Sequence, residues 1–276
     1  MSEPAVLFAV EGSIARVTLN RPERANAIDL EVARALVEAA IRCDADAAIR
    51  CVVLTGRGRM FCAGGDLALF AQAGEKIPSL LSELAGTLNM AVSRFMRMAK
   101  PLLVLINGPV AGAGLSLALS GDVVVAARSS HFTVAYSAIG LTPDGGLSWL
   151  LPRLVGLRKA QEMILTNLRV ASAEAESIGL VTRVVDDEAL EAEGLNTATH
   201  LARSATAALG AARSLLLESF PATLETHLAR EARAISAASA GGERREGIAA
   251  FLAKRHPNFA SVTAFTGPHI GSTEPR

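Results

Sequence analysis

Two glycine-rich segments of this chain are suited to presenting backbone N–H groups to a negatively charged oxygen. The first spans residues 61–66 (FCAGGD), and the second spans residues 107–114 (NGPVAGAG). Each follows an apolar run and leads toward a predicted helix, whose N-terminus favours negative charge. If both segments direct an N–H group at one oxygen, they form an oxyanion hole for acyl chemistry. The same spacing is compatible with close packing of a strand against a helix.

A third candidate is the carboxylate of Asp144, which lies in the segment 140–146 (GLTPDGG) just before an apolar stretch. A carboxylate at this point can be a helix N-cap and nothing more. If it faces an apolar pocket instead, loss of solvation raises its pKa toward values useful for transferring protons.

Other familiar sites are absent from the sequence. It contains no G-x-S-x-G elbow, no P-loop, no C-x-x-C and no H-E-x-x-H motif. The three cysteines, Cys43, Cys51 and Cys62, lack metal-type spacing and cannot all pair, which favours a reducing compartment. We therefore expect a cytoplasmic protein with no bound metal.

Composition excludes several classes of function. The 276 residues are 50% hydrophobic, which is incompatible with general disorder. Because 27 basic side chains balance 27 acidic ones and only 4% of residues are aromatic, we expect no nucleic-acid binding. The uncharged run 101–121 is long enough to span a membrane but is interrupted by Asn107-Gly108-Pro109. We interpret it as a buried strand, a turn and a helix, and expect no membrane association.

The elements that must position these groups alternate between strands and helices. A hairpin is predicted at 5–10 and 15–20, and Asp29 is predicted to cap a helix. Buried strands are predicted at 50–55, 102–107 and 122–127, and a short strand is predicted at 131–133. Helices are predicted at 79–98 and 113–120. This order indicates an α/β fold with mostly parallel strands.

The C-terminal part of the chain differs in character. Residues 188–253 are rich in alanine and periodic, with predicted helix breaks near Gly210, Pro221 and Gly241. Residues 262–276 have the composition of a disordered tail. We therefore divide the chain into a catalytic core at 1–186, a helical oligomerisation region at 187–261 and a tail at 262–276.

The order of several motifs resembles that of the crotonase, or enoyl-CoA hydratase/isomerase, superfamily. The matching segments are 20–27 (NRPERANA), 61–66 (FCAGGD), 106–114 (INGPVAGAG), 119–122 (LSGD), 139–146 (IGLTPDGG), 151–156 (LPRLVG) and 175–181 (AESIGLV). The resemblance covers about residues 5 to 260. It implies the crotonase fold, a spiral of ββα units with a helical C-terminal region used in trimerisation. It also implies an acyl-CoA thioester substrate, no cofactor beyond the coenzyme A of that substrate, and a homotrimer or a dimer of trimers.

The resemblance also assigns roles to individual positions. The N–H groups of Gly65 and Ala113 would hold the thioester oxygen, in agreement with the two glycine-rich segments described above. Residues at the positions that line the coenzyme are Ala63, Asp66 and Leu67. Arg24 stands where a basic residue often meets a CoA phosphate, although a solvated surface arginine is an equal alternative. Phe251 and Lys254 stand where CoA contacts from a neighbouring subunit occur.

The departures from the family pattern decide the predicted reaction. Typical hydratases of the family use two glutamates, and this chain has Ser116 and Tyr136 at those positions, so we place both hydroxyls in the substrate site. Asp144 matches the acidic residue of the family's enoyl-CoA isomerases, including those of phenylacetate degradation. We therefore expect an isomerase in which Asp144 moves the proton.

Three alternatives stay open at this point. The first is a hydratase in which Asp144 works with Tyr136 or Ser116 to place water, and the second is a non-catalytic acyl-CoA-binding protein. The third, dehalogenation of 4-chlorobenzoyl-CoA, is disfavoured. Ser93 replaces the histidine base of those enzymes, and Tyr136 replaces their tryptophan.

Overall fold

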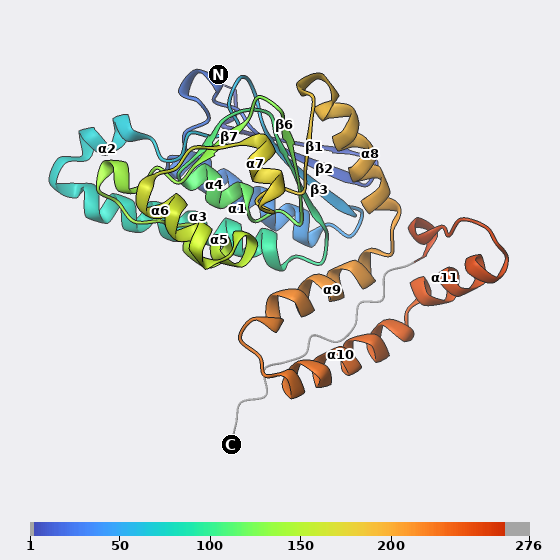
Figure 1. Cartoon of the computed structure of the whole chain (residues 1–276). Helices are drawn as coiled ribbons and strands as arrows, with labels where there is room; N and C mark the ends of the chain where they lie inside the picture. Colours follow the sequence, from blue (N-terminus) through green and yellow to red (C-terminus); the bar gives the residue numbers. More distant parts are fainter. Residues whose placement is uncertain (1–2, 263–276) are drawn as a thin grey trace. The chain divides into compact units, whose positions relative to one another are not determined.

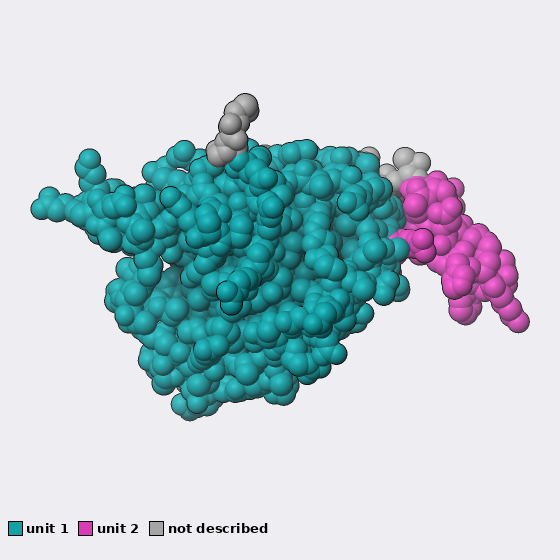
Figure 2. Space-filling model, turned by 90° about the horizontal axis from the view of Figure 1, so that it is seen from above, with its two compact units in different colours: residues 1–202 teal, residues 203–276 magenta. Residues whose placement is uncertain are grey.

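The structure is a computed structural model that describes residues 3–262. The chain divides after Ala202 into two compact units, residues 1–202 and residues 203–276 (Figures 1 and 2). Unit 1 carries all of the strands and most of the predicted site residues.

Unit 1 is built on a six-stranded sheet with the order β1-β2-β3-β4-β6-β9. Its strands are β1 (Val6–Glu11), β2 (Ile14–Leu19), β3 (Cys51–Gly56), β4 (Leu102–Ile106), β6 (Val123–Ala127) and β9 (Arg183–Val185). The pair β1 and β2 forms an antiparallel hairpin, and all the other pairs are parallel. The predicted hairpin and the three predicted buried strands are confirmed, whereas β9 was not predicted.

Both faces of this sheet are covered by helices, which is why its central strands are continuously apolar. Alternate side chains, such as Leu54 and Val104, pack on the side of α1 (Leu30–Ala45) and α3 (Ile77–Arg97). The intervening ones, such as Val53 and Leu105, belong to a second cluster with α8 (Leu190–Arg203) (Figure 1). Helix α8 approaches so closely at Gly194 that a Cβ there would lie 2.4 Å from Leu105 Cδ1.

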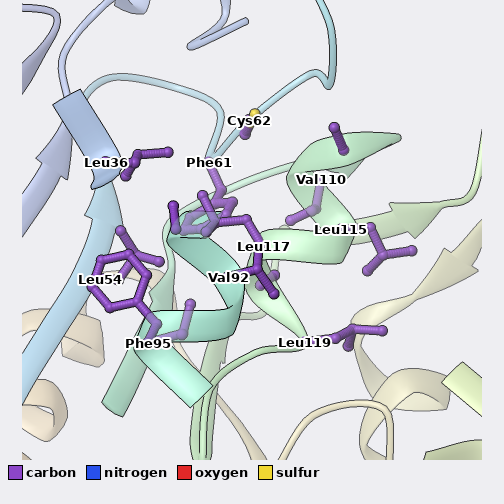
Figure 3. Close-up of a cluster of buried hydrophobic side chains, with 14 of the residues drawn as sticks. Leu36, Leu54, Phe61, Cys62, Val92, Phe95, Val110, Leu115, Leu117 and Leu119 are labelled. Atoms are coloured by element: carbon purple, nitrogen blue, oxygen red, sulfur yellow. The ribbon is translucent and has the colours of Figure 1, made fainter. Parts of the chain in front are cut away.

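The two long helices begin and pack as the sequence predicts. Asp29 is the N-cap of α1, and its carboxylate accepts a 2.9 Å hydrogen bond from the backbone N–H of Val32. Helix α3 buries Leu88, Val92 and Phe95 at helical spacing. In Figure 3, Val92 and Phe95 lie in one apolar cluster with Phe61, from the first glycine-rich segment, and with Leu115 and Leu117.

A second, three-stranded sheet carries the elements around the predicted site. Its order is β5-β7-β8, with β5 (Val110–Ala111), β7 (His131–Thr133) and β8 (Val170–Ala171). The short helix α4 (Ala113–Ala118) follows β5, and the predicted strand 131–133 is confirmed as β7. The remaining helices of unit 1 are α2 (Leu67–Ala73), α5 (Leu147–Val155), α6 (Leu157–Thr166) and α7 (Ser172–Ser177).

Helices form the C-terminal part of the described chain, as expected. Unit 2 contains α9 (Thr206–Ser219), α10 (Leu224–Ser239) and α11 (Gly242–Leu252). The predicted breaks near Pro221 and Gly241 are confirmed. The break at Gly210 is wrong, because this residue is buried within α9 and the chain turns before Thr206 instead. Helix α8 packs on the sheet of unit 1, so the boundary between units lies one helix later than the predicted boundary at 186. The predicted tail lies, from residue 263 onward, outside the described residues.

Lys100 joins the end of α1 to the start of β4 from inside the protein. Its ammonium donates hydrogen bonds to the carbonyl oxygens of Cys43, Asp44 and Asp46 at 2.5, 2.9 and 2.7 Å. Carbonyls at the end of a helix have no partner within the helix, so the lysine satisfies the carbonyls of Cys43 and Asp44, while the carbonyl of Asp46 also accepts from the N–H of Ile49 at 3.1 Å. Burial lowers the pKa of Lys100, and the neighbouring charge of Asp44 offsets part of this effect.

We predict that Lys100→Met lowers the free energy of unfolding by about 3 kcal/mol, because methionine keeps the apolar stem but leaves the carbonyls of Cys43 and Asp44 unsatisfied. The same substitution at Lys76, which is exposed, is the matched control and should change the value by less than about 0.5 kcal/mol. Urea denaturation of both variants at one protein concentration measures this. Equal stability of the two variants would contradict the role given to Lys100.

Candidate active site

The two glycine-rich segments meet in space. Cys62 forms a parallel bridge with Val110, and the N–H of Ala111 donates to the carbonyl of Cys62 at 3.0 Å. A Cβ built on Gly64 would lie 3.3 Å from the Cα of Gly112 and 3.4 Å from the nitrogen of Ala113. Both glycines have positive φ, +98° and +52°. The close approach therefore depends on glycine at both positions.

The N–H groups of Gly65 and Ala113 take no part in the pairing of their segments. The bridge between Ile28 and Gly65 uses the neighbouring groups instead: Ile28 N–H donates to Gly64 O, and Asp66 N–H donates to Ile28 O. Ala113 is the first residue of α4, where N–H groups lack an intrahelical partner. Within residues 3–262, no hydrogen bond occupies either group. Two unpaired donors thus belong to segments that touch each other.

Cys62 lies at the centre of this contact but is not suited to nucleophilic chemistry. Its Sγ lies 3.1 Å from the carbonyl oxygen of Asn26 and accepts a 3.4 Å contact from the N–H of Gly64. Complete burial raises the pKa of the Cys62 thiol to about 12, so it stays protonated at neutral pH. A Cβ on Gly114 would lie 2.6 Å from Cys62 Cβ, which shows how tightly α4 packs against this side chain.

Asp144 lies in a cluster with Ser116 and Tyr136, the two hydroxyl residues that were predicted to belong to the substrate site. The Tyr136 hydroxyl donates a 2.5 Å hydrogen bond to Asp144 Oδ1, and the Ser116 hydroxyl donates a 2.9 Å hydrogen bond to the backbone carbonyl of Asp144. Ser116 and Tyr136 are buried, and Asp144 is half-buried. Because Ser116 lies one helical turn after Ala113, α4 connects the Asp144 cluster to the contact between the glycine-rich segments.

Burial sets the protonation of this cluster. It raises the pKa of the Asp144 carboxyl above its usual range, and the hydrogen bond from Tyr136 offsets part of that rise. Burial and then the nearby charge of Asp144 raise the pKa of the Tyr136 phenol. Tyr136 is therefore a neutral hydrogen-bond donor at physiological pH, and Asp144 is a carboxylate of increased basicity.

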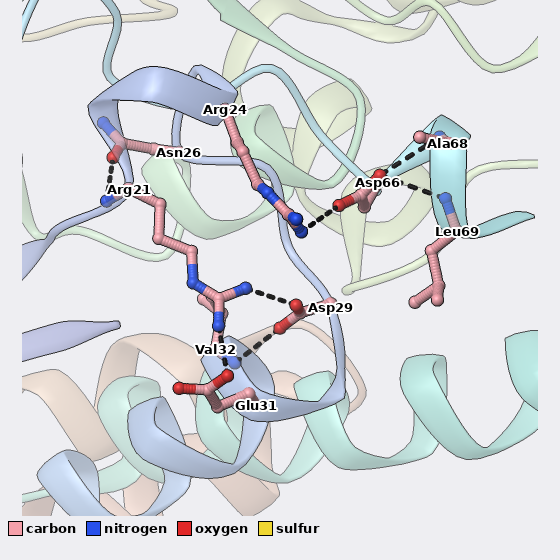
Figure 4. A network of polar contacts seen from close by, with 9 residues as sticks. All are labelled: Arg21, Arg24, Asn26, Asp29, Glu31, Val32, Asp66, Ala68 and Leu69. Atoms are coloured by element: carbon pink, nitrogen blue, oxygen red, sulfur yellow. Dashed lines mark hydrogen bonds and ion pairs between the residues drawn. The ribbon is translucent and has the colours of Figure 1, made fainter. Parts of the chain in front are cut away.

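The predicted coenzyme-binding positions are grouped around the first glycine-rich segment. Asp66 is the N-cap of α2, accepting from the N–H groups of Ala68 and Leu69 at 3.1 and 3.2 Å, a role that the sequence analysis missed. Its other carboxylate oxygen pairs with Arg24 at 3.3 Å, as Figure 4 shows. The Arg24 side chain is 60% exposed, so it remains accessible to solvent.

The other residues assigned to the coenzyme differ in setting. Ala63 is half-buried and donates its N–H to the carbonyl of Ala25, whereas Leu67 is exposed at the start of α2. Phe251 and Lys254 lie in unit 2, at the end of α11 and just beyond it, and Phe251 is exposed.

Polar side chains behind the site fix the surrounding loops, and the sequence analysis missed their roles. The side-chain amide of Asn26 donates to the carbonyls of Arg57, Met60 and Phe61, which shapes the loop entering the first glycine-rich segment. Arg21 pairs with Asp29 and Glu31 at the start of α1 (Figure 4). Arg21 and Asn26 belong to the motif at residues 20–27, which marks them in the sequence. A motif alone does not say which groups its side chains contact.

Neither a membrane span nor a metal centre is found in the part of the chain that the structure describes. None of its helices combines the length and the apolar character needed to cross a bilayer. Across residues 3–262, no three His, Cys, Asp or Glu side chains are grouped as metal ligands would be.

Comparison with known proteins identifies the class to which this fold and this site belong. The family described as enoyl-CoA hydratase/isomerase matches residues 9–262. The chain belongs to this family of enzymes of acyl-CoA metabolism, and its α/β architecture is the crotonase fold.

Individual relatives match over nearly their whole length. The 1,2-epoxyphenylacetyl-CoA isomerase of Escherichia coli is 39% identical over 92% of this chain and 97% of its own. The 2,3-dehydroadipyl-CoA hydratase of the same species is 34% identical over 88% and 93%. The crystal structure of an enoyl-CoA hydratase from Polaromonas sp. JS666 superposes with a TM-score of 0.88 at 34% identity, covering 91% of this chain and 98% of its own.

We predict that Gly145→Ala destabilises the protein more than Gly146→Ala does. Both glycines have positive φ, so alanine is strained at either position. Only at Gly145 would the new Cβ also meet another atom, Ser116 Cβ at 2.6 Å, whereas the space around Gly146 is open. We expect the extra overlap to cost about 1–3 kcal/mol. Chemical denaturation measures the loss of unfolding free energy in each variant. Equal losses would show that the turn at residues 140–146, which contains Asp144, is not packed against Ser116.

Proposed function

We propose that this protein is an enoyl-CoA isomerase that moves a carbon–carbon double bond by single-carboxylate proton transfer. The observation that carries the proposal is that Ser116 and Tyr136 donate hydrogen bonds to Asp144. The resemblance places these two hydroxyls where hydratases of the family have glutamates. Hydration needs one group to activate water and another to protonate carbon, whereas a double-bond shift needs one group that removes a proton and returns it.

The proposed reaction begins with a 3-enoyl thioester. Asp144 takes a proton from C2, and the electrons of the C–H bond move into the thioester to give a dienolate. The N–H groups of Gly65 and Ala113 stabilise the negative oxygen of this dienolate. The protonated Asp144 then returns the proton to C4, which leaves the double bond between C2 and C3. The relative that is 39% identical is named as an isomerase of 1,2-epoxyphenylacetyl-CoA, which supports isomerisation of an acyl-CoA as the reaction class, while the hydratase name of another relative keeps hydration as the competing outcome.

We predict that Asp144→Asn lowers the isomerisation of 3-enoyl-CoA esters by a hundredfold or more, about the contribution of a general acid–base group. Asp186→Asn, which changes an exposed carboxylate in the same way, is the control and should retain the rate. Formation of the conjugated thioester is followed by ultraviolet absorbance with panels of 3-enoyl-CoA and 2-enoyl-CoA esters.

Three other outcomes would overturn parts of this proposal. Full activity in Asp144→Asn would remove this residue as the base. Hydration of 2-enoyl-CoA without isomerisation would make the protein a hydratase. Binding of the esters with no turnover of either panel would favour a non-catalytic acyl-CoA-binding protein.

We also propose that the chain forms a homotrimer or a dimer of trimers through unit 2. This follows from the resemblance to the crotonase superfamily and is supported by the surface of α10. Leu224, Leu228 and Ile235 fall on one stripe of this helix, and all three are exposed. Exposed apolar stripes of this kind are typical of interaction surfaces.

We expect light scattering to give three or six times the 28.7 kDa mass of the chain. The double variant Leu228→Lys, Ile235→Lys should shift the protein to smaller species, because charges in an apolar interface lose their solvation. Ala237→Lys places a lysine on the opposite side of α10 and should leave the mass unchanged. A monomeric wild type, or an unchanged mass in the double variant, would refute an interface on this stripe.

A further inference from the structure

Tyr136 and Ser116 hold Asp144 at two different points. The Tyr136 hydroxyl donates to the carboxylate oxygen Oδ1, whereas the Ser116 hydroxyl donates to the backbone carbonyl of the same residue. The two hydroxyl oxygens lie 3.3 Å apart. Because each hydroxyl has a single proton and each makes a shorter hydrogen bond to Asp144, the 3.3 Å contact between Ser116 and Tyr136 is the weaker, secondary hydrogen bond of the cluster.

We propose that Tyr136 is a positioning residue that occupies Oδ1 of Asp144, and that Oδ2 is the oxygen that exchanges the proton with the substrate. This inference rests on the proposed isomerase function and specifies how its base is held. A carboxylate has two equivalent oxygens in solution, and a donor fixed on one of them leaves the other to react.

The arrangement serves both halves of the proton transfer. When Oδ2 carries the proton, Oδ1 becomes the carbonyl oxygen of a carboxylic acid and still accepts from Tyr136. The phenol therefore need not move or ionise between removal of the proton from C2 and its return to C4. Burial of Tyr136, which keeps the phenol neutral, is consistent with a donor that stays in place.

No other ionisable side chain shares this role within the described chain. The elements that meet the Asp144 turn are α4 with Ser116, the segment after β7 with Tyr136, and α3, whose Leu88 lies 3.6 Å from a Cβ built on Gly145. Tyr136 is the one ionisable side chain among residues 3–262 that acts on the pKa of Asp144. Removing its hydroxyl therefore changes one interaction of the carboxylate and adds no new charge.

The test is the pH dependence of kcat/KM in Tyr136→Phe, which keeps the buried ring and removes only the hydroxyl. Its hydrogen bond favours the charged form of Asp144, so its loss raises the pKa of the base. The acidic limb of the profile should then move to higher pH by about one unit. Ser120→Ala removes another buried hydroxyl, which bonds to Leu117 at the end of α4, and should leave the limb in place.

A structural role alone would give a different result. If Tyr136 only supported the fold, Tyr136→Phe would lower kcat/KM by the same factor at every pH, and the limb would not move. That result would overturn the inference while leaving the isomerase proposal intact. Conversely, full isomerase activity in Asp144→Asn would refute the proposed base itself, so the two failures are distinguishable.

A second measurement does not depend on activity. In protein labelled with ¹³C at the aspartate carboxyls, the Asp144 signal is the one missing from Asp144→Asn. Its titration should occur at higher pH in Tyr136→Phe than in wild type, by the same amount as the kinetic limb. An unchanged titration would show that Tyr136 does not bond to this carboxylate in solution, whatever substrate the enzyme takes.

Discussion

The site depends on the close approach of two backbone segments at the ends of parallel strands. Gly64 and Gly112 come together with positive φ, a conformation in which other residues are strained, and a Cβ on Gly64 would lie only 3.1 Å from the carbonyl oxygen of Ala111. Parallel strands place their carboxyl ends at one edge of the sheet, so the loops after β3 and β4 start near each other. Glycine then allows their backbones to touch. The tight packing of Cys62 against Gly114 and the cluster around Phe61 hold this contact in place from behind.

Once α4 is fixed by this contact, the position of Asp144 follows from it. Ala113 begins the helix at the contact, and Ser116, one turn later, binds the main chain of Asp144. The N–H group of Ala113, a proposed oxyanion donor, and the carboxylate of Asp144 are thus connected through α4. A carboxylate in place of Ser116 would bring a second negative charge beside Asp144, and like charges at such a distance raise the pKa of one partner. Neutral hydroxyls at positions 116 and 136 leave Asp144 as the single carboxylate of this cluster.

Much of this arrangement could be predicted from the sequence. The β-branched runs identified the central strands, and 131–133 was placed to the residue. The motifs gave the positions of Gly65, Ala113 and Asp144. Contacts across the fold could not be predicted, because hydrophobic periodicity describes one element at a time. The bond between Tyr136 and Asp144 therefore went unnoticed, as did the capping of α2 by Asp66. Gly210 was taken as a break, since glycine is unfavourable within helices, yet it is buried inside α9.

In the cluster of Ser116, Tyr136 and Asp144, the position of the turn and the proton affinity of Asp144 depend on different hydrogen bonds. Burial makes Asp144 more basic, which favours proton removal, but a carboxylate that is too weakly solvated would be protonated at working pH. A hydrogen bond from Tyr136 opposes that protonation without adding a charge, and the bond from Ser116 to the backbone fixes the turn without touching the carboxylate. Ser116 therefore sets the position of the turn, whereas Tyr136 sets the orientation and the proton affinity of the carboxylate. A change at Ser116 should act mainly through the position of the turn, and a change at Tyr136 mainly through the proton affinity of Asp144.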